Sequence, residues 1–179
     1  MLASPIETER LRIRRFKLDD WPDVHTYTGD AGVVTYLPEG QMTEEQTRQF
    51  VAENVGEDAR AHAVELQTEG RLIGHMLFHP WYAERIYEIG WVLNPIYHGQ
   101  GYATEAATAL LRYGFESLQI HRLIATCQPQ NRPSWRVMEK LGMQREGHFR
   151  KCIPRGETTW WDEYFYAILE EDWFSANTR

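Results

Sequence analysis

Hydrophobic and polar residues alternate along several short stretches of the chain, which is the pattern of half-buried strands. In the first stretch, Leu11 and Ile13 alternate with Arg12 and Arg14. The other stretches that we predict to be strands are Ala61–Leu66, Leu72–Phe78, Ile86–Leu93, Leu123–Cys127, Met143–Phe149 as the start of a strand, and Trp160–Leu169. Turn residues separate the three strands between residues 61 and 93, so these are expected to form an antiparallel meander.

Two helices are predicted between the first strand and the meander. Asp19 or Asp20 is suited to cap the first helix, with Pro22 in its first turn. The second helix is expected to begin at Thr43, because Gln46 follows at the spacing of a capping box.

A third helix is predicted after a glycine-containing loop at residues 98–101. Its face is formed by residues at helical spacing, namely Ala103, Ala107, Leu110, Leu111, Gly114, Phe115 and Leu118. A shorter helix is expected over Ser134–Leu141, ended by Gly142, and a late hairpin is expected to turn near residues 154–156. This order of elements predicts an α/β (α+β) fold, in which helices cover both faces of a central sheet.

Length and charge narrow the class of protein. The 179 residues suit one domain, and no internal repeat or low-complexity linker interrupts them, so we expect a single domain over residues 1–179. The formal net charge of −7 gives no sign of the basic stripe that nucleic-acid binding needs. No apolar run approaches the roughly 18 residues of a membrane span, and the first residues lack a signal-peptide core. We therefore expect a cytoplasmic protein with neither nucleic acid nor membrane as a partner.

Cysteine and histidine spacing does not indicate a metal site. Cys127 and Cys152 are widely spaced and lie in apolar, strand-like stretches, so both are predicted to be reduced and structural. His75 and His79 share one face of a predicted strand, but no carboxylate or cysteine stands at a convincing spacing from them. The acidic residues 170–172 are interpreted as a solvated cap on a terminal turn.

The loop at residues 98–101 is the most informative stretch for function. Gly99 and Gly101 have no Cβ, so backbone N–H groups there can approach an anion closely. The helix that follows presents its first N–H groups and the positive end of its dipole to the same anion. The loop therefore indicates a phosphate-binding site, with simple turn geometry as the alternative.

Two well-known phosphate-binding motifs fit this loop poorly. The Rossmann fingerprint requires a third glycine, and the P-loop requires a Gly-Lys-Ser/Thr end, and both features are absent. A Rossmann loop also opens the first βαβ unit of a chain, whereas this loop follows an antiparallel meander. The ligand is therefore expected to be a different phosphate compound.

Three motifs then occur in a specific order. His98, Gly101 and Ala103 match the pattern Arg/Gln-x-x-Gly-x-Gly/Ala, with histidine at its first position. A second motif, Asn-x-x-Ser followed by a Lys-Leu-Gly-Phe-like end, is represented by Asn131, Ser134, Lys140, Leu141, Gly142 and Met143. Together with the opening Glu7–Leu11, these motifs resemble the GCN5-related N-acetyltransferase (GNAT) superfamily over nearly the whole chain. The branch that the chain resembles comprises ribosomal-protein N-terminal acetyltransferases of the RimJ/RimL kind.

The resemblance implies a mixed, mostly antiparallel GNAT-like sheet and an enzyme that transfers an acetyl group from acetyl-CoA to a primary amine. From the histidine and cysteine spacing, no metal is expected. The coenzyme is expected to contact Trp91, Val92, Leu93, His98, Gly99, Gln100, Gly101, Tyr102, Ala103, Thr104, Asn131 and Ser134. By the same resemblance, the pantetheine arm lies along the splayed edge of the strand at residues 86–93, and the N–H near Val92 polarises the thioester carbonyl.

The histidine at position 98 departs from the arginine or glutamine that is usual in the family. Histidine titrates near neutral pH, so coenzyme affinity is expected to depend on pH. Because the family's main diphosphate contacts come from backbone N–H groups, His98 is expected to weaken coenzyme binding without abolishing it.

Two residues are candidates for catalysis. Glu88 lies on the same face of its strand as Gly90 and Val92 and is suited to take a proton through water, with a surface or salt-bridged glutamate as the alternative. Ser134 is suited to hydrogen-bond or protonate the coenzyme sulfur, or else to cap its helix through its hydroxyl. Asn131 is expected to contact the coenzyme rather than to catalyse.

The motifs do not determine the acceptor. A protein N-terminal amine, as in the ribosomal-protein branch, is the first hypothesis, and a small amine such as an amino acid, a polyamine or an antibiotic is the second. A non-catalytic acyl-CoA-binding module is the third, and it has no need of groups beside the thioester. Several aromatic residues are candidates for lining an acceptor cleft, namely Trp81, Tyr82, Trp91, Trp160 and Trp161. The sequence leaves a monomer or a homodimer open.

Overall fold

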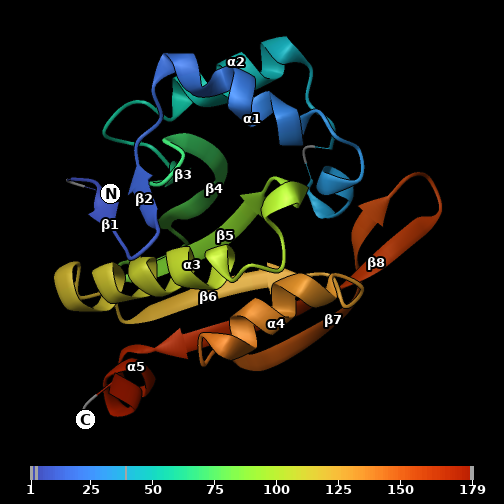
Figure 1. The fold of residues 1–179 in the computed structure, drawn as a ribbon. Coiled ribbons are helices and arrows are strands. Elements are labelled where there is room, and N and C mark those ends of the chain that lie inside the picture. Colours follow the sequence, from blue (N-terminus) through green and yellow to red (C-terminus); the bar gives the residue numbers. More distant parts are fainter. Residues whose placement is uncertain (1, 3, 39, 178–179) are drawn as a thin grey trace. The chain divides into compact units, whose positions relative to one another are not determined.

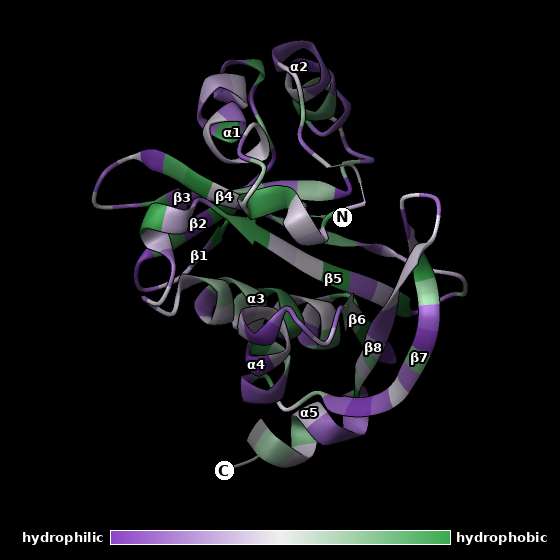
Figure 2. Ribbon diagram, turned by 90° about the vertical axis from the view of Figure 1, so that its right-hand side faces the viewer, coloured by the Kyte–Doolittle hydropathy of each residue, from purple (hydrophilic) through white to green (hydrophobic). Residues whose placement is uncertain are grey.

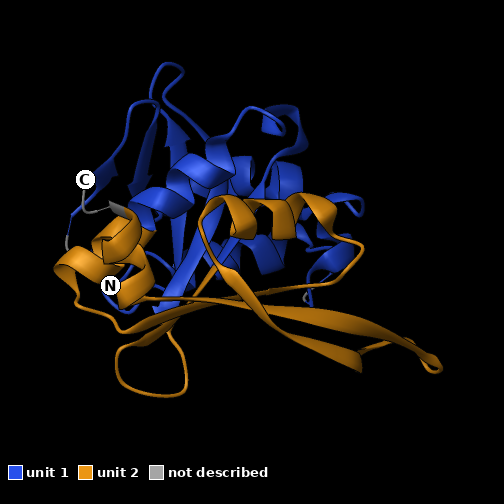
Figure 3. Ribbon diagram, turned by 90° about the horizontal axis from the view of Figure 1, so that it is seen from below, with its two compact units in different colours: residues 1–79, 90–110 blue, residues 80–89, 111–179 orange. Residues whose placement is uncertain are grey.

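The computed structural model describes residue 2, residues 4–38 and residues 40–177. The chain divides into two compact units that alternate along the sequence (Figure 3). Unit 1 comprises residues 1–79 and 90–110, and unit 2 comprises residues 80–89 and 111–179. Strand β5 (Ile86–Leu93) and helix α3 (Tyr102–Arg112) contribute to both units. A single domain over residues 1–179 stays a prediction.

Unit 1 contains the strands of the first half of the chain. Across the sheet they are β1 (Ile6–Glu7), β2 (Leu11–Arg14), β3 (Ala61–Leu66), β4 (Arg71–Pro80, except its last residue) and the second half of β5. The pairs β1–β2, β2–β3 and β3–β4 are antiparallel. Leu11 and Ile13 are fully buried, because alternate side chains of a strand point to the same face. The strands predicted from alternation in this region are confirmed.

Helices lie on both sides of the unit 1 strands. Helices α1 (Trp21–Thr28) and α2 (Glu44–Glu53) lie on one side of β3 and β4, and the unit 1 part of α3 lies on the other (Figure 1). Both faces of β3 are therefore buried. The core under α1 and α2 is apolar and includes Val24, Tyr27, Val51, Ala61, Ala63 and Leu72. Removing these side chains from water is the main contribution to the stability of this layer.

The caps of these two helices differ from each other. Thr43 caps α2 as predicted: its Oγ1 accepts a hydrogen bond from the Gln46 N–H at 3.2 Å, and Gln46 Oε1 accepts one from the Thr43 N–H at 2.8 Å. Asp20 precedes α1 but makes no side-chain cap to it. Instead its carboxylate accepts hydrogen bonds from the guanidinium of Arg14 and from the Lys17 N–H, which holds a short 3₁₀ turn over Leu18–Asp20.

Unit 2 contains the strands of the second half of the chain. Across the sheet they are the first half of β5, then β6 (Arg122–Cys127), β8 (Thr159–Leu169) and β7 (Gln144–Arg155). The β5–β6 pair is parallel, and β6–β8 and β8–β7 are antiparallel. The predicted mixed, mostly antiparallel sheet is thus confirmed. The edge strand β7 is mostly hydrophilic (Figure 2), which disfavours pairing with the edge of another chain.

In unit 2, the structure corrects the predicted start of one helix. A π-helical turn over Tyr113–Ser117 extends α3, and α4 (Arg132–Lys140) and α5 (Glu170–Asn177) follow. Helix α4 begins two residues before the predicted Ser134, because the Asn131 side chain caps it by accepting a hydrogen bond from the Ser134 N–H at 3.4 Å. The alternative interpretation of Ser134, in which its hydroxyl caps this helix, is therefore wrong. Among the helices of the described residues, none is long and apolar enough to cross a membrane.

Candidate active site

The glycine loop of unit 1 has the backbone of an anion site. It links a 3₁₀ turn at Pro95–Tyr97 to α3, and Gly99 and Gly101 have φ angles of +74° and +85°. These angles favour glycine because other residues are strained there. The first helical bond of α3 runs from the Glu105 N–H to the Gly101 carbonyl at 3.0 Å. The N–H groups of residues 102–104 therefore have no acceptor within the helix and suit an anionic ligand.

His98 is held by the main chain of the preceding strand. Its Nε2 donates a hydrogen bond to the Leu93 carbonyl at 2.8 Å, and Gln100 Nε2 donates one to the Ile96 carbonyl at 3.3 Å. The imidazole thus fixes the start of the loop. Gly99, Gln100 and Gly101 are exposed, so the loop is accessible to a ligand.

The residues of β5 that precede the loop have buried or half-buried side chains, so a ligand would contact mainly their backbone. Val92 and Leu93 are buried, and Trp91 is half-buried. Strand β4 approaches closely here, because a Cβ on Gly74 would lie only 2.4 Å from the Val92 carbonyl oxygen. The predicted contact of a coenzyme with the N–H near Val92 stays a prediction.

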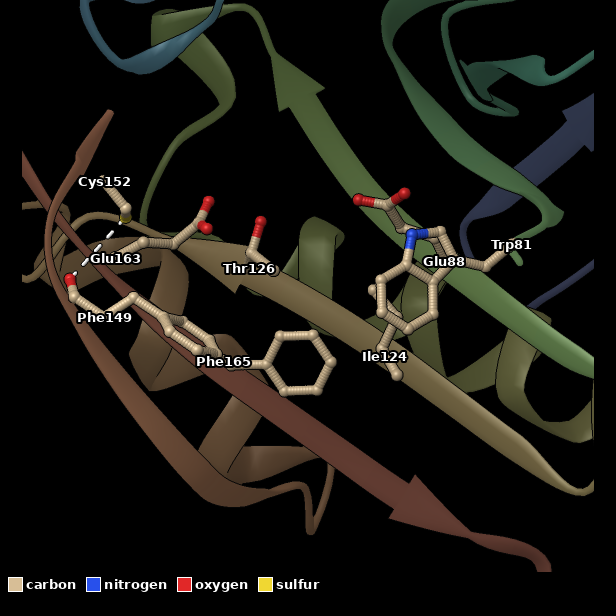
Figure 4. Close-up of a pocket in the computed structure, with 8 residues that line it drawn as sticks. All are labelled: Trp81, Glu88, Ile124, Thr126, Phe149, Cys152, Glu163 and Phe165. Atoms are coloured by element: carbon tan, nitrogen blue, oxygen red, sulfur yellow. Dashed lines mark hydrogen bonds between the residues drawn. The ribbon is translucent and has the colours of Figure 1, made fainter. Parts of the chain in front are cut away.

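A pocket of about 460 Å³ opens on one face of the unit 2 strands. It is lined by Trp81, Glu88, Ile124, Thr126, Phe149, Cys152, Glu163 and Phe165. The strand register explains this grouping: Glu88 pairs with Ile124, Thr126 pairs with Phe165, and residues two apart on one strand share a face. The carboxylates of Glu88 and Glu163 lie on the same side of β6, with the Thr126 hydroxyl between them (Figure 4).

Aromatic rings form the walls of this pocket. The ring centroids of Trp81 and Phe165 are 5.7 Å apart, and those of Phe149 and Phe165 are 6.1 Å apart in an edge-to-face arrangement. The Cys152 thiol donates a hydrogen bond to the Phe149 carbonyl at 3.6 Å (Figure 4). Phe149 is 50% exposed and Trp81 is 40% exposed, so an apolar ligand would cover ring surface that now faces water.

Asn131, Ser134 and Cys127 lie together in unit 2. Burial raises the pKa of Cys127 to about 12, although a hydrogen bond from the Ser134 side chain lowers it in part. Cys127 is therefore a protonated thiol near neutral pH, consistent with a structural role. Both cysteines are free, as predicted, but Cys152 is exposed at the pocket rather than enclosed in apolar surroundings.

The aromatic residues expected at the acceptor cleft separate in the structure. Of the five, Trp81 alone lines the described pocket. Tyr82 is exposed and its ring forms an edge-to-face pair with Trp81. Trp160 is exposed, and Arg155 lies over the ring of Trp161. Sequence reasoning missed Phe149, Glu163 and Phe165, although the alternation of Glu163 and Phe165 with tyrosines along β8 was a usable signal.

The histidines that were considered for metal binding have other partners. His75 Nδ1 lies 2.9 Å from the Tyr27 hydroxyl, and the Arg60 guanidinium lies 3.1 Å from His79 Nδ1. No group of three or more potential metal ligands occurs in the part of the chain that the structure describes. The absence of a metal from the reaction stays a prediction.

Comparison with known proteins identifies the family. The sequence profile of the acetyltransferase (GNAT) domain matches residues 10–144, which is more than half of the chain. A Bacillus subtilis protein named as an uncharacterized N-acetyltransferase, YnaD, is 55% identical over 168 residues, covering 94% of this chain and 98% of that protein. A crystal structure of a GNAT-family acetyltransferase from Bacillus anthracis has a TM-score of 0.89 at 57% identity, covering 93% of this chain and 99% of that one.

These likenesses define the class of protein as an acetyltransferase. The chain belongs to the GNAT family, and it is a GNAT-type N-acetyltransferase.

Relatives with a named acceptor are more distant. The Escherichia coli [ribosomal protein uS5]-alanine N-acetyltransferase is 29% identical over 85 residues, which is 48% of this chain and 43% of that protein. The Escherichia coli spermidine N(1)-acetyltransferase is 27% identical over 151 residues, which is 76% of this chain and 74% of that protein. These two relatives act on different classes of amine.

Proposed function

We propose that the enzyme transfers the acetyl group of acetyl-CoA to a primary amine of a small, cationic acceptor that binds in the pocket of unit 2. The observation that carries this proposal is the presence in one pocket of two carboxylates, Glu88 and Glu163, together with the rings of Trp81, Phe149 and Phe165. Carboxylates attract ammonium groups, and the faces of aromatic rings attract cations.

The dimensions of the pocket support a small acceptor. A volume of about 460 Å³ lies in the range of small-molecule sites. Glu88 and Glu163 lie on the strands that flank β6, and strand geometry puts their Cα atoms roughly 15 Å apart. An elongated acceptor with a positive charge near each end suits this spacing. We propose that Glu88 faces the amine to be acetylated and that Glu163 binds the second charge.

For the donor, we propose that the diphosphate of acetyl-CoA binds the backbone N–H groups of the glycine loop and of the first turn of α3. The exposed loop, its two positive φ angles and the free N–H groups of the helix start fit a diphosphate. The proposed coenzyme contacts are those expected from the sequence, namely Trp91, Val92, Leu93, His98, Gly99, Gln100, Gly101, Tyr102, Ala103, Thr104, Asn131 and Ser134.

In the proposed reaction, the amine nitrogen forms a bond to the thioester carbonyl carbon, and the carbon–sulfur bond then breaks. Glu88 takes the proton that the amine loses, directly or through one water molecule. The departing thiolate takes up a proton from the Ser134 hydroxyl, the proposed donor. Ser134 then regains a proton from water, and Glu88 releases its proton to solvent. The products are the acetylated amine and CoA, so no oxidant or metal is required.

A protein N-terminal amine, the first hypothesis from the sequence, is the second candidate acceptor. It is supported by the likeness to the uS5-alanine N-acetyltransferase, which covers less than half of this chain. A free N-terminus also carries an ammonium group, which the Glu88 carboxylate would attract.

Thiol release from acetyl-CoA over matched acceptors tests the proposal. The acceptors are a linear diamine, the monoamine of equal chain length, and one peptide with its N-terminus either free or blocked. We expect the highest kcat/KM with the diamine, and a value at least tenfold lower with the monoamine. Turnover confined to the peptide with a free N-terminus would replace the small acceptor by the second candidate. Binding of acetyl-CoA without turnover on any amine would contradict the proposal.

A further inference from the structure

Glu105 places a negative charge where the proposed function requires an anion to bind. It lies in the first turn of α3, and its N–H makes the first helical bond, to Gly101. A carboxylate at this end of a helix stabilises the helix, but it repels a diphosphate that binds the same end. A coenzyme site here therefore needs a group that offsets the charge of Glu105.

Arg10, from the turn between β1 and β2, is paired with this carboxylate. Its Nε donates to Glu105 Oε2 at 2.6 Å, its Nη2 lies 2.6 Å from the same oxygen, and its backbone N–H donates to Oε1 at 2.9 Å. The Thr8 hydroxyl donates to Oε1 at 2.6 Å. Burial raises the pKa of Glu105, but the hydrogen bonds from Thr8 and Arg10 outweigh this effect and lower it, so the carboxylate is ionised at neutral pH.

The same guanidinium contacts the glycine loop. Arg10 Nη1 donates to the Gln100 carbonyl at 3.0 Å, and its Cζ lies 4.4 Å from the centroid of the Tyr102 ring. Arg10 thus touches the residues on both sides of Gly101. A Cβ on Gly101 would lie 3.5 Å from Arg10 Nη2, so the side chain packs directly against this glycine.

This contact matters because glycine has more backbone freedom than any other residue, and a ligand must overcome that freedom when it orders a glycine loop. A side chain that holds the loop in its binding conformation beforehand reduces this cost.

We propose that Arg10 is a positioning residue for the diphosphate of acetyl-CoA: it neutralises Glu105 and holds the Gln100 carbonyl, so that the N–H groups of the loop are ready for the ligand. The proposal rests on the proposed function of the glycine loop as the donor site. Arg10 acts through the loop and through Glu105, and it takes no part in the transfer of the acetyl group.

Kinetics of four full-length variants test this role. Arg10→Met removes the charge and keeps the aliphatic stem, Glu105→Gln removes the opposing charge, and the third variant combines both. Arg12→Met is the matched control, since Arg12, in the adjoining strand β2, pairs at 3.0 Å with Glu7 of β1 and not with Glu105. We expect Arg10→Met to raise KM for acetyl-CoA about tenfold, with kcat and the acceptor KM within about twofold of the parent. The double variant should recover at least a third of the lost affinity, and Arg12→Met should behave like the parent.

A truncated donor separates positioning from a general structural role. S-Acetylpantetheine lacks the diphosphate, so Arg10→Met should leave its kcat/KM unchanged. An equal loss with both donors, or an unchanged KM for acetyl-CoA, would overturn the proposal, and a double variant as weak as Arg10→Met would overturn the neutralising role. These outcomes differ from a failure of the proposed function, in which the parent enzyme itself would not bind acetyl-CoA.

Discussion

Glu88 on β5 and Ile124 on β6 form the last pair of the parallel register, which runs from Ile86 with Arg122. Beyond this pair, β6 goes on pairing with β8 as far as Cys127, and its side chains at 124 and 126 form the floor of the pocket. The candidate base therefore stands where the pairing of β5 with β6 ends and the pocket begins.

Replacement of Glu88 should affect the rate more than binding. Glu88→Gln is expected to lower kcat by about a hundredfold or more while KM for acetyl-CoA stays within about threefold, because general bases contribute roughly this factor. The pH dependence of kcat/KM measures the same role. If Glu88 is the base, kcat/KM of the parent should fall at acidic pH and that of the variant should not. Identical pH profiles would show that Glu88 only lines the pocket.

Glu163 should act on the acceptor alone. Glu163→Gln is expected to raise the acceptor KM about tenfold for a diamine and hardly at all for the matching monoamine, because the variant loses one charge-assisted contact. Glu157→Gln, in the exposed turn of the β7–β8 hairpin, is the control. A loss of the same size with both amines would speak against recognition of a second charge.

His98 should tolerate arginine. Its imidazole holds the Leu93 carbonyl, whereas the proposed diphosphate contacts come from backbone N–H groups. His98→Arg is therefore expected to bind acetyl-CoA within about threefold of the parent in a calorimetric titration, and His98→Ala, which has no donor, is expected to bind more weakly. Much weaker binding by His98→Arg would count against the assignment of this loop to the coenzyme.

His75 should make folding sensitive to acid. Burial lowers its pKa to about 3, and its Nδ1 contacts the Tyr27 hydroxyl. The unfolded ring takes up a proton below its ordinary pKa of about 6.5, so this contribution to stability is complete above that pH and is lost as pH falls toward 3.

Urea unfolding between about pH 7 and pH 5 measures this effect. The free energy of unfolding of His75→Gln should fall less over this interval than that of the parent, because glutamine does not titrate. His121→Gln, at an exposed histidine, is the control. Equal slopes for parent and His75→Gln would show that His75 is not responsible.

Structural features that depend on residues close in sequence were predicted from local patterns. The alternation at residues 11–14 and the spacing of Thr43 and Gln46 predicted a strand and a capping box, because both depend on contacts within a few residues. The Asn131 cap was missed since Asn131 and Ser134 are equally suited to end a loop, and only the backbone path decides between them.

The features that the sequence did not predict depend on contacts between residues far apart in the chain. The Arg10–Glu105 pair joins residues 95 positions apart, and no periodicity in the sequence connects them. The pocket likewise depends on the order β6-β8-β7, which brings Phe149 and Glu163 to the face that carries Glu88. Strand order and register follow from the packing of the whole sheet, so only the structure gives this set of residues.

Acetyl transfer to a small diamine is tested most directly by mass spectrometry of the acceptor after the full-length enzyme has been incubated with acetyl-CoA and the best diamine. We predict that the amine gains the mass of one acetyl group, that CoA appears in equal amount, and that Glu88→Gln makes little of either. CoA released without acetylated amine, or no CoA at all with every acceptor, would contradict this prediction.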